Sequence, residues 1–291
     1  MRKPFFALIL SIICSSAEAQ RFELDLFGGI SNYQGDLQPR FFTSQSANPG
    51  AAAILKVGLT EKLFLRAGFT FGSVAASDAT NKTSLRRRNL SFRSGVQEFA
   101  AGIEYRLAGA EARLVPYLFA GAGIFRFNPY AYDPNDASRV YLQPLHTEGQ
   151  GLPQYPSLQP YKLTQVCFPF GFGIKWNINC NLNLGLEFRQ TATRTDYLDD
   201  VSGRYADPLA LLAGPGGQRS VDFAWRGDEL NGAPYPPAGS RRGNPEQNDW
   251  YYFTGLTLGL RINDCETGRL SLGGIFGGSG RKGRLGCPDR F

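Results

Sequence analysis

A short acidic stretch, TDYLDDVSGRY, contains the residues whose types and spacing most suggest chemistry. Asp196, Asp199 and Asp200 place three carboxylates within five residues. Such oxygens can hold a calcium ion, a carboxylate pair can act as acid and base, and Asp side chains in loops accept hydrogen bonds from backbone N–H groups. The stretch lacks the D-x-[DN]-x-[DN]-G order of a calcium loop, and nothing around it supplies a partner base. We therefore predict that Asp196, Tyr197, Asp199 and Asp200 form a hydrogen-bonded loop motif, with Tyr197 and Leu198 turned inward.

The rest of the sequence offers little for catalysis. The only histidine, His146, lies in the proline-rich stretch LQPLHTEGQGLPQYP, and a Ser-His-Asp triad or a histidine-containing zinc site would have to use it. The glycine-rich stretch at 273–283 lacks the order of a phosphate-binding loop and is interpreted as a flexible tether. We predict no catalytic residue, no metal and no cofactor. The formal net charge of +6 comes without a long basic run, so we expect no nucleic-acid partner.

The beginning of the chain is typical of an export signal. Arg2 and Lys3 precede an apolar run over 5–13, and small residues end in Ala17-Glu18-Ala19, an A-x-A cleavage pattern. We predict a signal peptide over 1–19. No later stretch offers the roughly eighteen consecutive apolar residues of a transmembrane helix, whereas 35 glycines and 13% aromatic residues favour a β-rich domain.

Alternating apolar and polar residues in eight stretches predict eight strands. In KLFLRAGFTFG, for example, Leu63, Leu65 and Phe69 oppose Arg66 and Thr70. The stretch LVPYLFAGAGIFRFN is apolar on both faces, so its orientation stays open. The faces opposite the apolar ones carry acids and bases in nearly equal number: Glu23, Asp25, Glu98, Glu104 and Glu187 against Lys56, Arg66, Arg106, Lys175, Arg189 and Arg261.

The links between the strands alternate in length. They are short near Thr60, Gly109 and Asn179 and long elsewhere, the longest running from about Asp196 to Asp249. This pattern predicts an all-β fold: an eight-stranded antiparallel up-and-down transmembrane β-barrel over 20–262, with long external loops. A soluble eight-stranded barrel or sandwich with its apolar face inward is the alternative. The balanced charges favour the membrane barrel, because they fill a narrow lumen without leaving a buried charge unpaired.

Several sequence blocks spread over nearly the whole mature chain point to one known family. They are GISNYQGDL (29–37), PYLFAGAGIFRFNP (116–129), YKLTQVCFPFGFGIKW (161–176), LGLEFRQTATRTDYLDDVSGRY (184–205), DWYYFTGLTLGLR (249–261) and the terminal CPDRF (287–291). These blocks resemble the PorG-like outer-membrane β-barrels of Bacteroidetes. The resemblance implies an outer-membrane, non-enzymatic anchoring component of the type IX secretion system. Its implied partners are a periplasmic ring lipoprotein and a ring subunit.

Two features leave the function open. The segment 206–248 is long and idiosyncratic, and paralogues of such barrels can work outside the secretion machinery. The alternative is a stand-alone small outer-membrane barrel that binds a ligand or lipid or forms a narrow porin. Lys82 and the run Arg86, Arg87 and Arg88 make one external loop basic. A solvated loop and a contact with lipopolysaccharide phosphates both fit these residues.

The glycine-rich tail over 263–291 follows the last strand and is predicted to be periplasmic. We predict a disulfide between Cys265 and Cys287, because the periplasm is oxidising, with Cys180 as a competing partner and Cys167 less accessible within its strand. The family resemblance implies that the basic tail presents a docking surface for the ring subunits. Its candidate contacts are Arg269, Arg281, Lys282 and Arg284.

Overall fold

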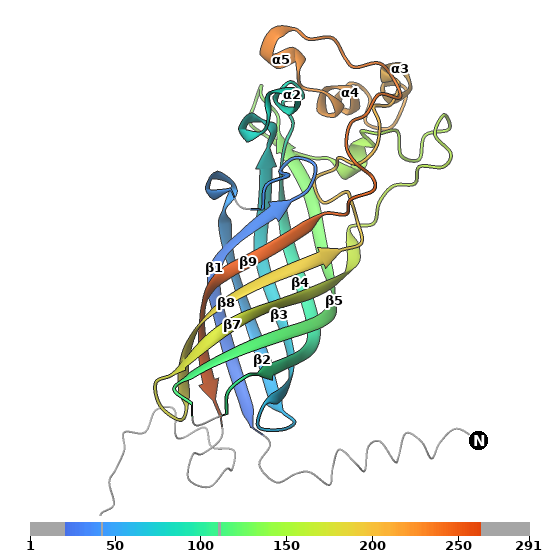
Figure 1. Cartoon of the computed structure of the whole chain (residues 1–291). Helices are drawn as coiled ribbons and strands as arrows, with labels where there is room; N and C mark the ends of the chain where they lie inside the picture. Colours follow the sequence, from blue (N-terminus) through green and yellow to red (C-terminus); the bar gives the residue numbers. More distant parts are fainter. Residues whose placement is uncertain (1–20, 42, 110–111, 263–291) are drawn as a thin grey trace, which may run out of the picture.

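The computed structural model describes residues 21–41, 43–109 and 112–262. Eight strands form a closed antiparallel barrel (Figure 1), as predicted: each pairs with its neighbour in the chain, and β1 pairs with β9 to close the sheet. The strands are β1 (Phe22–Gln34), β2 (Asn48–Gly58), β3 (Leu63–Ser77), β4 (Ser91–Arg106), β5 (Leu114–Tyr132), β7 (Thr164–Asn177), β8 (Leu182–Thr193) and β9 (Trp250–Arg261). A ninth strand, β6 (Arg139–Tyr141), only extends β5 as a hairpin beyond the barrel wall.

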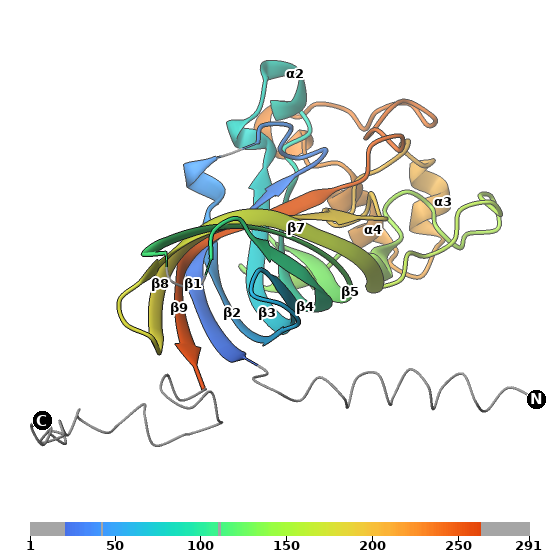
Figure 2. The same cartoon turned by 60° about the horizontal axis from the view of Figure 1, so that its bottom comes forward.

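Short and long links alternate as expected and gather at opposite ends (Figure 1). We call these the short-turn end and the long-loop end. The short turns span 59–62, 107–113 and 178–181. The long loops contain η1 (Ser44–Ser46), η2 (Asp78–Thr80), α2 (Thr83–Arg86), η3 (Gln143–Leu145), α3 (Pro208–Leu212), α4 (Gln218–Ala224) and α5 (Asp228–Asn231). The longest loop, residues 194–249, covers the barrel mouth and is called the lid from here on. Figure 2 shows that the lid helices lie to one side of the barrel axis.

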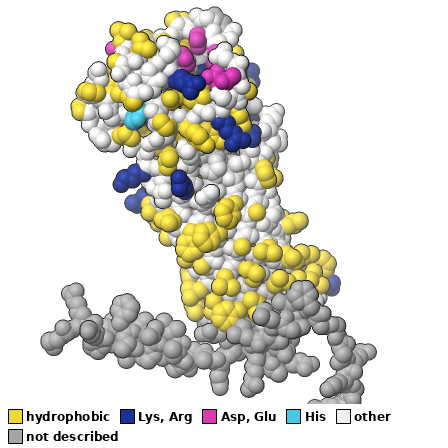
Figure 3. All heavy atoms as spheres, turned by 180° about the vertical axis from the view of Figure 1, so that it is seen from behind, with side chains coloured by type: hydrophobic (Ala, Val, Ile, Leu, Met, Phe, Trp, Pro, Cys, Tyr) yellow, Lys and Arg dark blue, Asp and Glu magenta, His cyan; other side chains and the backbone are white. Residues whose placement is uncertain are grey.

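The outer surface carries a belt of apolar side chains (Figure 3). Phe172 is 57% exposed, and Leu256 is 65% exposed. Further exposed members are Leu26, Ile30, Leu55, Leu65, Phe69, Phe99, Ile103, Leu118, Ile124, Phe170, Ile174, Trp176, Leu184, Leu186 and Leu258. A continuous apolar surface of this extent is unfavourable in water and marks contact with another apolar phase. Among the described residues, no helix is long and apolar enough to cross a membrane.

Strand β5, whose orientation the sequence left open, is apolar on both faces because the lumen is apolar near the long-loop end. Leu118 and Ile124 point outward, whereas Phe125 and Phe127 are almost fully buried. These inner rings belong to a core cluster that fills the upper lumen and continues under the lid. The lumen therefore holds an aromatic layer that the alternation pattern did not predict.

Several predictions fall on residues that the structure does not describe. These are the signal peptide over 1–19 and the tail over 263–291, with Cys265, Cys287, Arg269, Arg281, Lys282 and Arg284. Of the two cysteines in the described part of the chain, Cys167 is a buried free thiol and Cys180 is disulfide-bonded. The Cys265–Cys287 bridge stays a prediction.

Candidate functional site: the filled lumen and its lid

The charged residues predicted to face inward do line the lumen. All five acids and five of the six bases are buried, and Arg261 is partly buried. Two lysines lie in the lumen near the short-turn end: Lys56 Nζ lies 2.6 Å from Asp25 Oδ2 and also contacts Glu104. Lys175 contacts Glu23 and lies 3.1 Å from Asp25 Oδ2. Because each lysine bridges two carboxylates, these charges compensate one another.

Further ion pairs and hydrogen bonds extend this network towards the long-loop end. Arg66 donates to Glu187 at 3.2 Å, and the Tyr117 hydroxyl donates to the same carboxylate at 2.9 Å. Higher in the lumen, Glu98 accepts a hydrogen bond from Tyr251 at 2.7 Å and faces Arg189 at 3.4 Å. An eight-stranded barrel is only wide enough for its own side chains, and here they are packed and paired across the bore.

The acidic stretch named at the outset lies directly above the aromatic layer. Leu198 is fully buried, and Tyr197 is half-buried and stacks on Tyr161, with ring centroids 4.8 Å apart. Asp199 accepts hydrogen bonds from the backbone N–H groups of Leu37 at 3.1 Å and Val201 at 2.9 Å. It therefore ties the lid to the first long loop.

Asp200 and Asp196 differ from Asp199 in their partners. Asp200 accepts hydrogen bonds from the side chains of Thr147 at 2.6 Å and Tyr161 at 2.7 Å, so it caps hydroxyl groups of the third long loop. Burial raises the pKa of Asp200 to about 6. Asp196 is also buried, but neither of its carboxyl oxygens has a hydrogen-bond partner in the described structure, and burial raises its pKa to about 8. Asp199 and Asp200 thus face separate partners, and the three carboxyl groups do not converge on one point. No group of His, Cys, Asp or Glu in the described part of the chain is arranged to hold a metal ion.

A phenol between two carboxyl groups forms the centre of the lid. The Tyr33 hydroxyl lies 2.6 Å from Asp199 Oδ2 and 2.7 Å from Asp249 Oδ1. We call these three residues the latch. A tyrosine hydroxyl has one proton to donate, so the second short contact requires a proton on a carboxyl group.

Backbone contacts show which carboxyl group of the latch carries that proton. Both oxygens of Asp199 already accept backbone N–H groups, from Leu37 and Val201. In Asp249, Oδ2 accepts from the backbone N–H of Leu198 at 2.8 Å, while Oδ1 faces the Tyr33 hydroxyl. The geometry fits a protonated Asp249 that donates to Tyr33, which in turn donates to an ionised Asp199. Burial, together with the Asp199 and Asp196 carboxylates, raises the pKa of Asp249 well above its usual range.

A second set of contacts joins the lid to the neighbouring loops. Glu148 accepts hydrogen bonds from the backbone N–H groups of Ser202 at 2.9 Å and Gly203 at 3.0 Å. Arg242 donates to Glu148 at 3.0 Å and to the Asp200 carbonyl at 2.6 Å. Both charged side chains are buried, so loss of one would leave the other without compensation.

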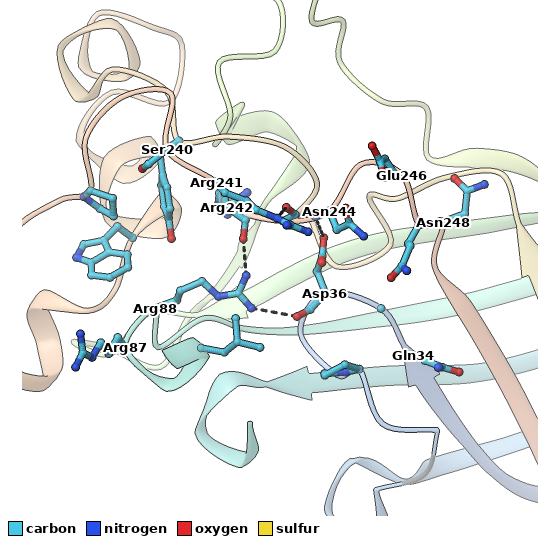
Figure 4. A pocket seen from close by; sticks show the side chains of 18 of the residues that line it. Gln34, Asp36, Arg87, Arg88, Ser240, Arg241, Arg242, Asn244, Glu246 and Asn248 are labelled. Carbon is cyan, nitrogen blue, oxygen red and sulfur yellow. Dashed lines mark hydrogen bonds between the residues drawn. The ribbon is translucent and has the colours of Figure 1, made fainter. Parts of the chain in front are cut away.

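Arg88, from the basic run of the second long loop, is a structural clamp. It forms an ion pair with Asp78 at 2.8 Å and donates to the carbonyls of Arg242 at 2.6 Å and Asp36 at 3.1 Å. Figure 4 shows that Arg88 lies at the wall of a cavity of about 970 Å³ between the lid and the first two long loops. Arg86 and Arg87 remain exposed. The run therefore has one buried and two solvent-facing members.

Tyr33, Asp249, Glu148 and Arg242 were not singled out from the sequence, although they hold the acidic stretch in place. Tyr33 lies in the middle of the block GISNYQGDL and is the last residue but one of β1, whereas Asp249 opens the block DWYYFTGLTLGLR and directly precedes β9. The signal available in the sequence was Asp249, an acidic residue directly before a strand. The lone His146 is half-buried at the end of η3, where its ring contacts the Gln150 carbonyl.

These features define a closed eight-stranded antiparallel β-barrel with an apolar exterior, an ion-paired lumen and a latched lid. A family model described as "Domain of unknown function (DUF6089)" matches residues 2–143. No curated protein matches the chain.

Three solved structures illustrate the similarity in fold. Neisserial surface protein A is 8% identical with a TM-score of 0.40, covering 82% of this chain and 96% of its own. Ail of Yersinia pestis, solved with the heparin analogue sucrose octasulfate, is 8% identical with a TM-score of 0.39, covering 83% and 98%. A major outer membrane protein from Thermus thermophilus is 12% identical with a TM-score of 0.40, covering 84% and 99%. The assignment of the fold itself rests on the strand pairing described above.

Proposed function

We propose that the chain is a non-enzymatic, non-conducting barrel of a bacterial outer membrane, with its short-turn end in the periplasm. The observation that carries this proposal is the combination of an apolar belt outside with a fully paired charged lumen inside. Short periplasmic turns and long external loops are the usual topology of such barrels. The latched lid adds a second closure at the long-loop end.

We further propose that the barrel anchors the periplasmic ring of the type IX secretion system. The resemblance to PorG-like barrels supports this role. Strand β9 ends at the short-turn end, so in the proposed topology Ile262, the last described residue, lies on the periplasmic side. The basic tail residues and the Cys265–Cys287 bridge remain the proposed contact with the ring lipoprotein and ring subunit.

Crosslinked co-purification from native outer membranes tests this anchoring role. Truncation after Asn263 should leave a barrel that still inserts, while recovery of ring subunits should fall several-fold. If recovery is undiminished, the short turns and not the tail hold the ring. If the intact protein brings down no ring subunit at all, the anchoring role is wrong.

Thiol labelling tests the proposed topology. Single cysteines at Thr60, Gly109 or Asn179, in a variant without the native cysteines, should resist a membrane-impermeant maleimide on whole cells. Single cysteines at Asn135 or Gly232, in long loops, should react, and all should react after lysis. Labelling of only the short turns on whole cells would reverse the orientation.

Conductance tests whether the lumen is closed. Reconstitution into planar bilayers should give no steady ion-selective current steps, because paired side chains occupy the bore. A larger porin reconstituted in parallel controls for insertion. Reproducible unitary steps would support the narrow porin instead.

A stand-alone ligand-binding barrel is the second candidate function, and the cavity in Figure 4 favours it. Its wall contains Trp225, Trp250, Arg87 and Arg241 as well as the Arg88 clamp, so aromatic and cationic groups face one space. Co-purification of a small molecule with the isolated barrel, and no ring subunit, would favour this reading.

A further inference from the structure

The apolar belt ends at the same level on two adjacent strands. Along the outer face of β4, exposed Phe99 is followed towards the long-loop end by Gln97 and Arg93. On β5, exposed Ile124 is followed by Arg126. Phe99 pairs with Ile124, and Gln97 pairs with Arg126. The change from apolar to cationic side chains therefore marks the boundary between the belt and the loops.

Three arginines line one groove just beyond this boundary. Arg93 and Arg126 project from the outer faces of β4 and β5, and Arg139 projects from the β6 hairpin. The groove has a volume of about 490 Å³, and the Arg139 guanidinium lies 5.2 Å from the centre of the Tyr130 ring. Figure 3 shows Lys and Arg side chains projecting above the apolar belt, on its long-loop side.

No acidic side chain compensates these three charges within the described residues. None of the residues that line the groove is Asp or Glu, and none of the three arginines forms an ion pair with a described residue. The acids nearest to Arg139 in sequence, Asp133 and Asp136, accept backbone hydrogen bonds within the hairpin turn, and the acid nearest to Arg93, Glu98, is buried in the lumen. Three like charges around one groove repel one another unless an anion binds among them.

We propose that this groove binds the phosphate groups of a lipid headgroup in the outer leaflet. Guanidinium groups bind phosphate oxygens through paired, charge-assisted hydrogen bonds. Tyr130 and Tyr141 add hydroxyl groups and ring edges suited to the headgroup level of a membrane. The groove opens on the outer wall at the end of the belt, so a lipid whose chains lie along Phe99 and Ile124 places its phosphates beside the arginines.

The basic run of the second long loop is a less suitable site for the same phosphates. Arg88 is buried in its ion pair with Asp78, and Arg86 donates to the Asn81 carbonyl at 2.7 Å. Only Lys82 and Arg87 remain exposed without such a partner in the described structure. The inference rests on the proposed outer-membrane location but does not depend on the secretion partners.

The test uses the full mature protein purified in detergent micelles and titrated with diphosphorylated lipid A, with bound lipid counted by native mass spectrometry. The variant R93Q/R126Q/R139Q should bind lipid A about 100-fold more weakly, because several charge-assisted bonds are lost together. The matched control R40Q/R204Q/R219Q removes three exposed charges from the long loops and should bind like the parent. Lipid A without phosphates should bind the parent as weakly as the triple variant binds lipid A.

The proposal would be overturned if R93Q/R126Q/R139Q bound lipid A as tightly as the parent does, or if the control variant lost as much affinity for lipid A as R93Q/R126Q/R139Q. Inorganic pyrophosphate at millimolar concentration should not displace lipid A; full displacement would make this a soluble-anion site and refute the lipid assignment. A heat-dependent gel shift checks that each barrel is folded. If R93Q/R126Q/R139Q fails to fold, the single variant R126Q replaces it, and its affinity for lipid A should fall by an intermediate factor. Recovery of ring subunits with R93Q/R126Q/R139Q should equal that with the parent, so this experiment distinguishes a failure of lipid binding from a failure of the anchoring role.

Discussion

Replacement of Lys175 by methionine is expected to lower the free energy of unfolding of the barrel by about 3–5 kcal/mol. Lys175 is fully buried and bridges the carboxylates of Glu23 and Asp25. Removal of one member of a buried ionic group leaves the others without compensation, and that penalty exceeds the loss of the contact itself. Urea titration in micelles, followed by tryptophan fluorescence, measures the change.

The matched control for this change is Lys62→Met at a short turn. Lys62 is exposed, so the same substitution there should change the free energy of unfolding by less than about 0.5 kcal/mol. The double variant K175M/E23Q removes charge of both signs and should recover part of the loss. A stability of K175M within about 1 kcal/mol of the parent would contradict the paired lumen.

The latch should respond unequally to two chemically identical substitutions. Asp249→Asn keeps an acceptor for the Leu198 N–H and supplies an N–H towards Tyr33, so the lid should stay closed. Asp199→Asn places an N–H against a backbone N–H, because both oxygens of Asp199 are acceptors. The cost of a buried unsatisfied donor is about 1–3 kcal/mol. Proteolysis of the lid should therefore be accelerated about 5- to 100-fold in D199N only.

The same latch predicts a pH dependence with a definite sign. Burial, together with the Asp199 and Asp196 carboxylates, raises the pKa of Asp249 well above its usual range, so the closed latch keeps one proton on Asp249. An unfolded Asp has a pKa of about 3.9, so above that value the open lid releases a proton that the closed lid holds. The lid is then most stable at acidic pH and loses up to about 1.4 kcal/mol per pH unit as pH rises towards the raised pKa of Asp249.

Proteinase K digestion between pH 6 and 9 measures this effect, with rates normalised to an unfolded peptide at each pH. The parent lid should be cleaved faster as pH rises, and D249N should flatten the profile because its amide needs no titratable proton. A parent rate that falls with rising pH would show that ionised carboxylates close the lid. Chelators should leave the rate unchanged, and faster cleavage on chelation alone would support bound calcium.

Strand alternation predicted most of the barrel because a half-buried strand repeats every two residues. It placed Lys56, Arg66 and Lys175 in the lumen beside the acids that neutralise them. It could not orient β5, where Phe125 and Phe127 face inward and Ile124 faces outward. A local pattern cannot distinguish an apolar lumen from an apolar exterior when both sides of one strand exclude water.

The acidic stretch shows where sequence reasoning stopped. Hydrogen bonding of its carboxylates to backbone N–H groups was predictable from Asp residues in a loop and holds for Asp199, but Asp200 accepts from hydroxyl groups and Asp196 accepts from no group in the described structure. Tyr33 lies 166 residues from Asp199 and 216 residues from Asp249 along the chain. Only barrel closure brings them together, and no local spacing encodes contacts at such separations.

The position of the latch has a consequence for the order of assembly. Tyr33 pairs with Tyr251 across the seam where the first and last strands meet, and Asp249 directly precedes β9. The proton-sharing contact can therefore form only after the last strand has joined the first. Once formed, it holds that seam against sideways opening of the barrel. Protection of the lid from protease thus reports the final step of barrel closure, and a barrel stalled one strand short would remain cleavable.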